Sequence, residues 1–149
     1  MEAVRFPVWA CHHRGAKTIL QGARLTSLNY PNNLRPLNEA DVKDWVSHFE
    51  SRRWLPGLFG YLCDEPPAGC AWDDLGKFGK ALRAASPKMK ILVTTSISRA
   101  QQGGVLDQID ILAPVLDYIQ PKKAPSARND YDDWLKQPGK QLWWYQSCD

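Results

Sequence analysis

The sequence predicts an α/β fold in which parallel β/α units form part of a TIM (β/α)8 barrel. Apolar runs of strand length alternate with helical patterns over residues 39–149, which is typical of a parallel sheet with crossover helices. No GxGxxG or P-loop motif follows a strand, which disfavours an open nucleotide-binding sheet. A full barrel needs about 250 residues and eight strands. This chain has 149 residues and four clear strand patterns, so we expect a barrel truncated at both ends.

The first part of the chain is predicted to be loop-rich. A short apolar run around Phe6 is a doubtful strand, and residues 14–38 are rich in Gly, Asn and Pro, which is typical of loops. A helix is predicted over residues 39–54, because Asn38 suits the N-cap position and acidic residues crowd the first turn. Apolar residues at steps of three and four predict its buried face: Val42, Trp45, Val46 and Phe49.

The clear β/α units follow this helix. Strands are predicted over residues 58–63, 90–96, 109–114 and 141–148, each an apolar or aromatic run bounded by Pro, Gly or polar residues. Helices are predicted over residues 73–85, 100–108 and 129–136. We treat residues 1–149 as one partial domain, with its clear β/α units in residues 39–149.

Charge and hydropathy exclude two classes of partner. The net charge is +3, and Lys and Arg are scattered, so no basic stripe predicts nucleic-acid binding. No apolar run approaches the roughly 18 residues that indicate a membrane span. No charged-then-apolar signal pattern opens the chain, and the compartment stays open.

Cysteine and histidine spacing predicts neither a metal nor a cofactor. The four cysteines match no zinc template, and free structural thiols are expected, with Cys63 and Cys70 the only pair close enough in sequence to suspect. His12 and His13 lie beside Cys11, but no further ligands follow at a useful spacing. We expect them to be loop histidines.

The strongest candidate site is the pair Asp64 and Glu65, which ends the segment LFGYLCDEP. A strand that ends structurally does not need two adjacent acids. Successive side chains of a strand face opposite ways. Where the strand gives way to the loop this alternation relaxes, so both acids could reach a pocket at the carboxyl-terminal mouth of a barrel. The structural alternative is that Asp64 caps the following turn and Glu65 is solvated.

Further candidates follow the later strands. Trp143, Trp144 and Tyr145 could bind a sugar, because an aromatic face stacks on C–H groups and a Tyr hydroxyl can donate to an acetamide carbonyl. The alternative is that they fill a buried strand. Asp117 and Tyr118 come just after the strand at 109–114 and are candidate hydroxyl-binding residues.

Several motifs, in order, resemble the catalytic barrel of glycoside hydrolase family 123 and its relatives. They are YLCDEP, VTTS, IDILAP with the following LDY, and WWYQSC. The resemblance covers residues 58–148 and extends weakly to the helix before them. It implies retaining hydrolysis of β-linked N-acetylhexosaminides, typically of N-acetylgalactosamine. The oxygen of the substrate's acetamido group attacks the anomeric carbon in place of an enzyme carboxylate.

The resemblance also implies roles for the two acids. Glu65 would protonate the leaving oxygen and later activate water. Asp64 would orient and polarise the acetamide N–H while the oxazolinium ion forms. The general acid must hold its proton near neutral pH, and an adjacent negative charge such as that of Asp64 favours this.

Two other functions remain open at this point. The chain could be a noncatalytic carbohydrate-binding relative, or part of another TIM-barrel enzyme that uses paired acids, with or without a divalent metal; fold alone does not separate them. We also expect the isolated chain to have little or no activity, because an incomplete barrel leaves the pocket open to water.

Overall fold

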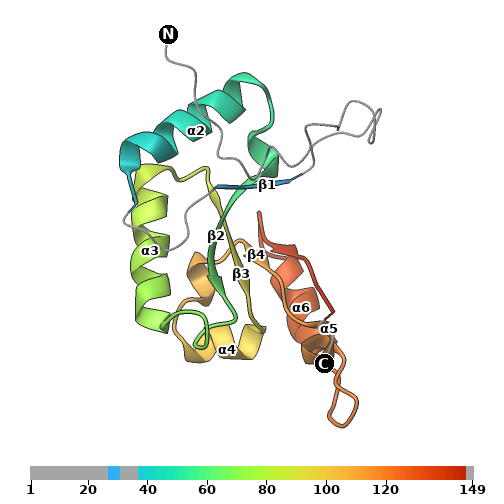
Figure 1. Cartoon of the computed structure of the whole chain (residues 1–149). Coiled ribbons are helices and arrows are strands. Elements are labelled where there is room, and N and C mark those ends of the chain that lie inside the picture. The colour runs from blue at the N-terminus through green and yellow to red at the C-terminus, as the bar shows by residue number, and fades with distance from the viewer. Residues whose placement is uncertain (1–26, 31–36, 147–149) are drawn as a thin grey trace.

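The computed structural model describes residues 27–30 and 37–146 (Figure 1). Its strands are β1 (Leu28–Tyr30), β2 (Leu58–Asp64), β3 (Lys90–Thr94), β4 (Ile111–Leu112) and β5 (Gln141–Leu142). Its helices are α2 (Glu39–Ser51), α3 (Trp72–Ala85), α4 (Ile97–Gln102), α5 (Leu116–Ile119) and α6 (Arg128–Leu135), with short 3-10 turns η2 (Leu55–Gly57) and η3 (Leu106–Gln108). The fold is therefore α/β, as predicted.

The five strands form one sheet in the order β1-β2-β3-β4-β5, and every pair is parallel. Spatial order thus equals chain order, and each crossover adds its strand on the same side of the previous one. Parallel neighbours require such crossover connections, here largely helical. Among the described strands, the order across the sheet runs in one direction only. In a doubly wound open sheet the strand order instead reverses at a switch point.

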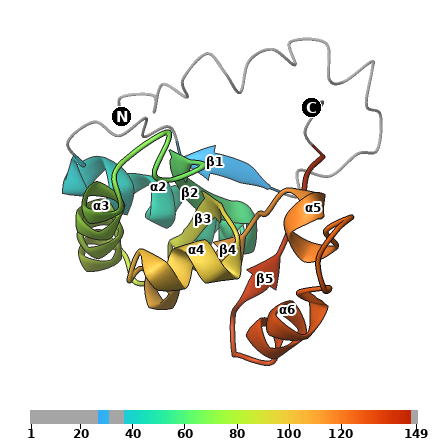
Figure 2. The same ribbon diagram turned by 90° about the horizontal axis from the view of Figure 1, so that it is seen from below.

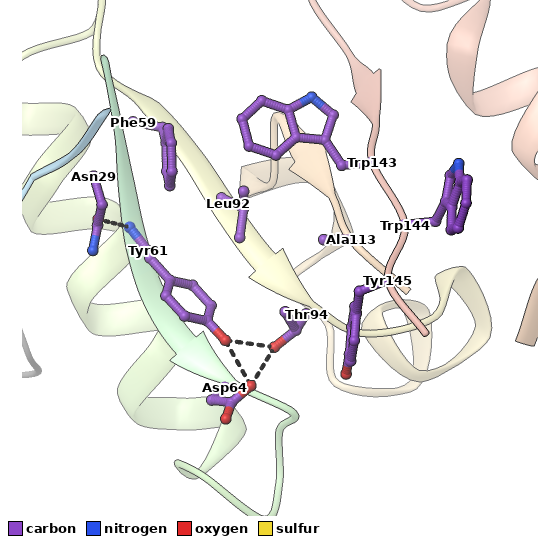
Figure 3. Close-up of a pocket in the computed structure, with 10 residues that line it drawn as sticks. All are labelled: Asn29, Phe59, Tyr61, Asp64, Leu92, Thr94, Ala113, Trp143, Trp144 and Tyr145. Atoms are coloured by element: carbon purple, nitrogen blue, oxygen red, sulfur yellow. Dashed lines mark hydrogen bonds between the residues drawn. The ribbon is translucent and has the colours of Figure 1, made fainter. Parts of the chain in front are cut away.

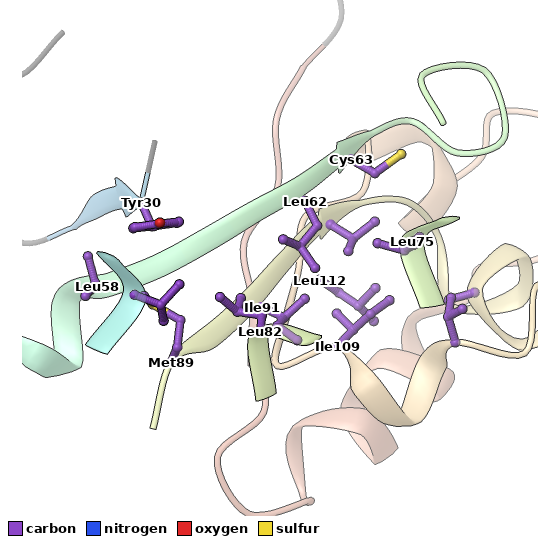
Figure 4. Close-up of a cluster of buried hydrophobic side chains, with 14 of the residues drawn as sticks. Tyr30, Leu58, Leu62, Cys63, Leu75, Leu82, Met89, Ile91, Ile109 and Leu112 are labelled. Atoms are coloured by element: carbon purple, nitrogen blue, oxygen red, sulfur yellow. The ribbon is translucent and has the colours of Figure 1, made fainter. Parts of the chain in front are cut away.

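The helices cover one face of this sheet. Alternate strand residues such as Leu58, Ile91 and Leu112 share a buried cluster with residues of α2, α3, α4 and α6 (Figure 4). Figures 1 and 2 show α2 and α3 on the same side of β2. A second cluster on the opposite face holds only strand and strand-end residues: Leu92, Ile111 and Ala113, with Phe59, Tyr61 and Trp143 against them. Among the described residues, no helix contributes to this second cluster.

Helix α2 forms as its sequence predicts. The side chain of Asn38 accepts hydrogen bonds from the backbone N–H groups of Ala40 and Asp41, which satisfies donors that the first turn leaves open. Its buried residues are the predicted ones: Val42, Trp45, Val46 and Phe49. Burying side chains of this size contributes about 1.5 to 3 kcal/mol each, so this face anchors α2.

Several hydrogen bonds lie where β3 and β4 begin. Arg83 of α3 donates to the carbonyl oxygens of Met89 and Gln108 and to the carboxylate of Asp110. The same Asp110 accepts from the backbone N–H of Ile91 at 2.8 Å. These contacts join the amino-terminal ends of β3 and β4 to α3.

Several element predictions are corrected. The loop predicted over residues 14–38 contains β1, whose strand character comes from its pairing with β2. The helix predicted over residues 100–108 is instead α4 followed by η3, because Ser96 caps the earlier start and Gly103 and Gly104 end it. The last strand is confined to Gln141–Leu142, with an isolated bridge at Tyr145.

The other predicted elements agree with the structure within a few residues. The predicted helix at 39–54 ends earlier, at Ser51. Residues 1–26, 31–36 and 147–149 lie outside the described residues, and with them the doubtful strand around Phe6, Cys11, His12, His13 and Cys148.

Candidate functional site

A pocket of about 420 Å³ lies on the sheet face opposite the described helices (Figure 3). It extends along the strands to the carboxyl-terminal ends of β2 and β3. Its floor is apolar and its far end is polar. The lining residues are Asn29, Phe59, Tyr61, Asp64, Leu92, Thr94, Ala113, Trp143, Trp144 and Tyr145.

A β-bulge turns Asp64 into this pocket. Tyr61 pairs with Leu92, but the next pair joins Cys63 to Val93, so one extra residue, Leu62, stands in β2. Leu62 and Cys63 both pack on the helix side. The pattern of facing residues is thereby shifted by one position, and Asp64 lies on the same face as Tyr61. Bulges next to functional sites commonly redirect a side chain in this way.

Glu65 is held in the same region by its backbone conformation and by two hydrogen bonds. Its backbone is left-handed, with φ 44°, which costs a residue with a Cβ atom roughly 1–2 kcal/mol. The backbone N–H of Glu65 donates to the Thr94 hydroxyl at 2.8 Å. The Tyr145 hydroxyl donates to the Glu65 carboxylate. One hydrogen bond to Thr94 of β3 and one from Tyr145, beyond β5, therefore hold the second acid beside the first.

The loop that carries both acids is tightly closed. Cys63 and Cys70 form a disulfide, and the backbone N–H of Ala68 donates to the carbonyl of Glu65 at 2.9 Å. A Cβ atom on Gly69 would lie 1.9 Å from the carbonyl oxygen of Asp64, so only glycine fits there. The prediction of free thiols is wrong for these two cysteines, because the fold-back at Gly69 brings their Cα atoms to 6.0 Å.

Hydroxyl groups surround the acids. The Tyr61 hydroxyl donates to Asp64 Oδ1 at 2.6 Å, and the Thr94 hydroxyl donates to the same oxygen at 2.9 Å. Burial, followed by the hydrogen bond to Asp64, raises the pKa of Tyr61 to about 12. Burial and the nearby Glu65 carboxylate raise the pKa of Tyr145 as well. Both phenols therefore keep their protons at neutral pH and act as donors.

The aromatic wall comes from the end of the chain. Trp143 packs edge-on against Phe59, with ring centroids 5.3 Å apart. Trp144 borders the pocket and is 61% exposed, while Tyr145 is half-buried. The backbone N–H of Tyr145 donates to Pro114 at 3.2 Å, which fixes this segment beyond β5.

The structure brings together most of the predicted site residues, although not all of them. Asp64, Trp143, Trp144 and Tyr145 line the pocket, and Glu65 joins them through its hydrogen bond to Tyr145. Asp117 and Tyr118 lie on α5 and are not among the lining residues. Both are exposed, and the Tyr118 ring lies 5.0 Å from the guanidinium carbon of Arg99.

The sequence reasoning missed Tyr61, Asn29 and Phe59. Tyr61 and Asp64 are three apart, and regular alternation would separate them onto opposite faces. Asn29 lies on the unpredicted strand β1, where its side chain accepts from the backbone N–H of Tyr61 at 2.9 Å. Phe59 lies two residues before Tyr61 in β2, so regular alternation places both side chains on the same face. Phe59 could therefore have been found from the sequence.

Two further observations concern metals and membranes. Among residues 27–30 and 37–146, no group of three or more His, Cys, Asp or Glu side chains is arranged to hold a metal ion. No helix in the same part of the chain has the length and apolar character needed to cross a bilayer.

Comparison with known proteins adds no family. No protein-family model and no curated protein sequence matches this chain.

Proposed function

We propose that this chain carries the catalytic acids of a retaining glycoside hydrolase that acts on β-linked N-acetylhexosaminides by substrate-assisted catalysis. One observation carries the proposal: Asp64 and Glu65 lie next to each other at the end of β2, and both are held toward one pocket with an aromatic wall. The bulge and the left-handed residue support it, because each departs from regular strand geometry where an acid is aimed.

The strand order supports the finer proposal that the sheet is part of a (β/α)8 barrel. In such a barrel each strand lies beside the next strand of the chain, helices form the outer layer, and the active site lies at the carboxyl-terminal ends of the strands. Sequential parallel order, helices on one face and a pocket reaching the ends of β2 and β3 agree with each of these features.

The proposed reaction has two steps. In the first, the acetamide oxygen of the substrate attacks the anomeric carbon, the glycosidic C–O bond breaks, and Glu65 gives its proton to the leaving oxygen. Asp64 accepts a hydrogen bond from the acetamide N–H and stabilises the positive oxazolinium ion. In the second, water attacks the anomeric carbon, Glu65 takes the proton of that water, and the acetamide oxygen is released. Two displacements retain the β configuration.

The pocket surfaces suit a sugar of this kind. Trp143 and Phe59 present apolar faces and edges on which the C–H side of a ring can pack. Trp144 is largely exposed and would contact the part of the substrate that leaves. Tyr145 lies beside Glu65, and its hydroxyl donates to that carboxylate.

The test is hydrolysis of a phenyl β-N-acetylgalactosaminide by the complete protein that carries this sequence. Glu65→Gln and Asp64→Asn should each reduce turnover by about a hundredfold or more, since each removes a group that acts in the transition state. Near-normal rates in both variants would refute the proposal. Binding of the sugar without turnover would favour a noncatalytic carbohydrate-binding protein, and loss of activity with a chelator would favour a metal-dependent enzyme.

A further inference from the structure

The Asp64 carboxylate is held by one of its two oxygens. Tyr61 and Thr94 both donate to Oδ1, at 2.6 and 2.9 Å. No hydrogen bond from the described residues reaches Oδ2. Two donors that converge on one oxygen from neighbouring strands restrict rotation of the carboxylate. The direction of Oδ2 is thereby fixed by β2 and β3 together (Figure 3).

The hydroxyl protons account for this arrangement. Each hydroxyl has a single proton to donate. The Tyr61 and Thr94 oxygens lie 3.1 Å apart, and both lie within hydrogen-bond distance of Asp64 Oδ1. When both protons point to Oδ1, the carboxylate accepts two hydrogen bonds and neither hydroxyl proton is left to donate to a substrate. The raised pKa of Tyr61 keeps its proton in place over the neutral range.

Thr94 has a second contact with the acid pair. Its oxygen accepts from the backbone N–H of Glu65 at 2.8 Å, and its hydroxyl lies 2.9 Å from Asp64 Oδ1 and 3.4 Å from the carbonyl oxygen of Cys63. Glu65 is the residue with the left-handed backbone, so this hydrogen bond stabilises a conformation that a residue with a Cβ atom otherwise avoids. A single side chain on β3 therefore contacts both acids of β2.

We propose that Tyr61 and Thr94 are positioning residues, which hold Asp64 by Oδ1 and present Oδ2 to the acetamide N–H of the substrate. Thr94 in addition fixes the backbone from which Glu65 reaches the leaving oxygen. This inference rests on the proposed function, and it adds to the two acids the pair of hydroxyl groups that sets their orientation.

The variants separate orientation from folding. Tyr61→Phe removes one donor and keeps the ring, and Thr94→Val removes the hydroxyl at nearly constant volume. We expect kcat to fall about tenfold for Tyr61→Phe and about a hundredfold for Thr94→Val, because small errors in the placement of catalytic groups are costly. KM should change less than about threefold. Thr94→Ser restores a hydroxyl and should recover most of the loss.

The matched control is Thr95→Val. Thr95 is buried, at 3% exposure, and its hydroxyl oxygen has no hydrogen-bond partner among the described residues. Its replacement by valine removes a hydroxyl one position from Thr94 and should leave kcat unchanged. Thermal melting of all the variants shows whether each one is folded.

A second readout tests Oδ2 directly. The fused thiazoline of N-acetylgalactosamine is a stable analogue of the oxazoline intermediate, and its ring nitrogen stands in for the acetamide nitrogen. Inhibition by the thiazoline should weaken about tenfold in Tyr61→Phe and Thr94→Val, because transition-state-like ligands depend most on correct placement. Inhibition by N-acetylgalactosamine itself should change less than about threefold.

The outcomes distinguish this inference from the proposed function. If the wild-type protein hydrolyses the aryl substrate and both Tyr61→Phe and Thr94→Val behave like Thr95→Val, the positioning roles are wrong and the proposed function stands. If the complete folded protein that carries this sequence shows no hydrolysis, the proposed function is wrong and the positioning roles fall with it. Loss of kcat and of thiazoline inhibition, with recovery in Thr94→Ser, supports both.

Discussion

Replacing Gly69 by alanine adds a methyl group against the backbone that carries both acids. The new Cβ atom would lie 1.9 Å from the carbonyl oxygen of Asp64 and 2.9 Å from its carbonyl carbon. Cβ contacts in proteins essentially never fall below 3.0 Å, so the two segments must separate by 3.0 − 1.9, or about 1.1 Å. The obstacle is backbone, which cannot rotate away as a flexible side chain can.

The expected magnitudes follow from this displacement. Overpacking of this kind costs about 1 to 3 kcal/mol of unfolding free energy, and each kcal/mol lowers the melting temperature of a chain this long by about 3 °C. The Cys63–Cys70 disulfide closes the same loop, so the shift is transmitted to Asp64 and Glu65. A misplacement of about 1 Å can reduce turnover on the order of a hundredfold.

The assay is made on the complete protein that carries this sequence, and it compares kcat/KM for a phenyl β-N-acetylgalactosaminide with the melting temperature of each variant. Gly76→Ala is the control. Gly76 lies in α3, and a Cβ atom there would lie 3.8 Å from the Val105 side chain, which is an ordinary contact distance. Alanine is favoured over glycine in a helix by about 1 kcal/mol, so this variant should be as stable as the wild type or slightly more stable, with unchanged kcat/KM. A Gly69→Ala variant with wild-type stability and turnover would refute the account of the loop.

Three further predictions concern the cross-link, the pH dependence and the isolated chain. Cys70→Ser removes the disulfide, which joins residues at a sequence separation of 7, and should lower the unfolding free energy by about 2 to 3 kcal/mol. Denaturant titration measures this change, and an unchanged midpoint would contradict it. The Tyr61 pKa is raised from 10.0 to about 12, so its contribution to stability is full below pH 10.0 and is lost as the pH rises to about 12. Denaturation across this window should show a smaller fall for Tyr61→Phe than for the wild type, and equal falls would contradict the shift. The proposed partial barrel predicts that the 149-residue chain by itself hydrolyses aryl N-acetylhexosaminides slowly or not at all, because water would enter its pocket. Rapid hydrolysis by the purified chain would contradict a partial barrel.

The elements that were predicted best are those whose signal is local. The run from Leu58 to Cys63 is apolar and follows a Pro-Gly break, and α2 has both a capping residue and a buried stripe. Strand β1 has no comparable signal, since it is three residues long and lies in an Asn-rich stretch. Its strand conformation depends on the pairing with β2, which is a tertiary contact.

The same distinction applies to the site. Two adjacent acids at the end of a strand are visible in the sequence, and in the structure Asp64 ends β2 and lines the pocket. The way in which Asp64 reaches the pocket depends on the bulge at Leu62, which is set by the register between β2 and β3. For this reason Tyr61 was missed. Cys63 and Cys70 were the only pair suspected from the sequence, but free thiols were expected, because the disulfide depends on a fold-back that only Gly69 permits.

The role of Glu65 as general acid can be tested most directly with two leaving groups. In Glu65→Gln, kcat/KM should fall by about 10² to 10⁴ for a phenyl β-N-acetylgalactosaminide, whose leaving oxygen needs a proton. For the dinitrophenyl glycoside, whose leaving group is stable as an anion, it should fall by less than about tenfold. This difference between the two substrates is the result that the account predicts. Equal losses on both substrates, or no loss on either, would contradict it.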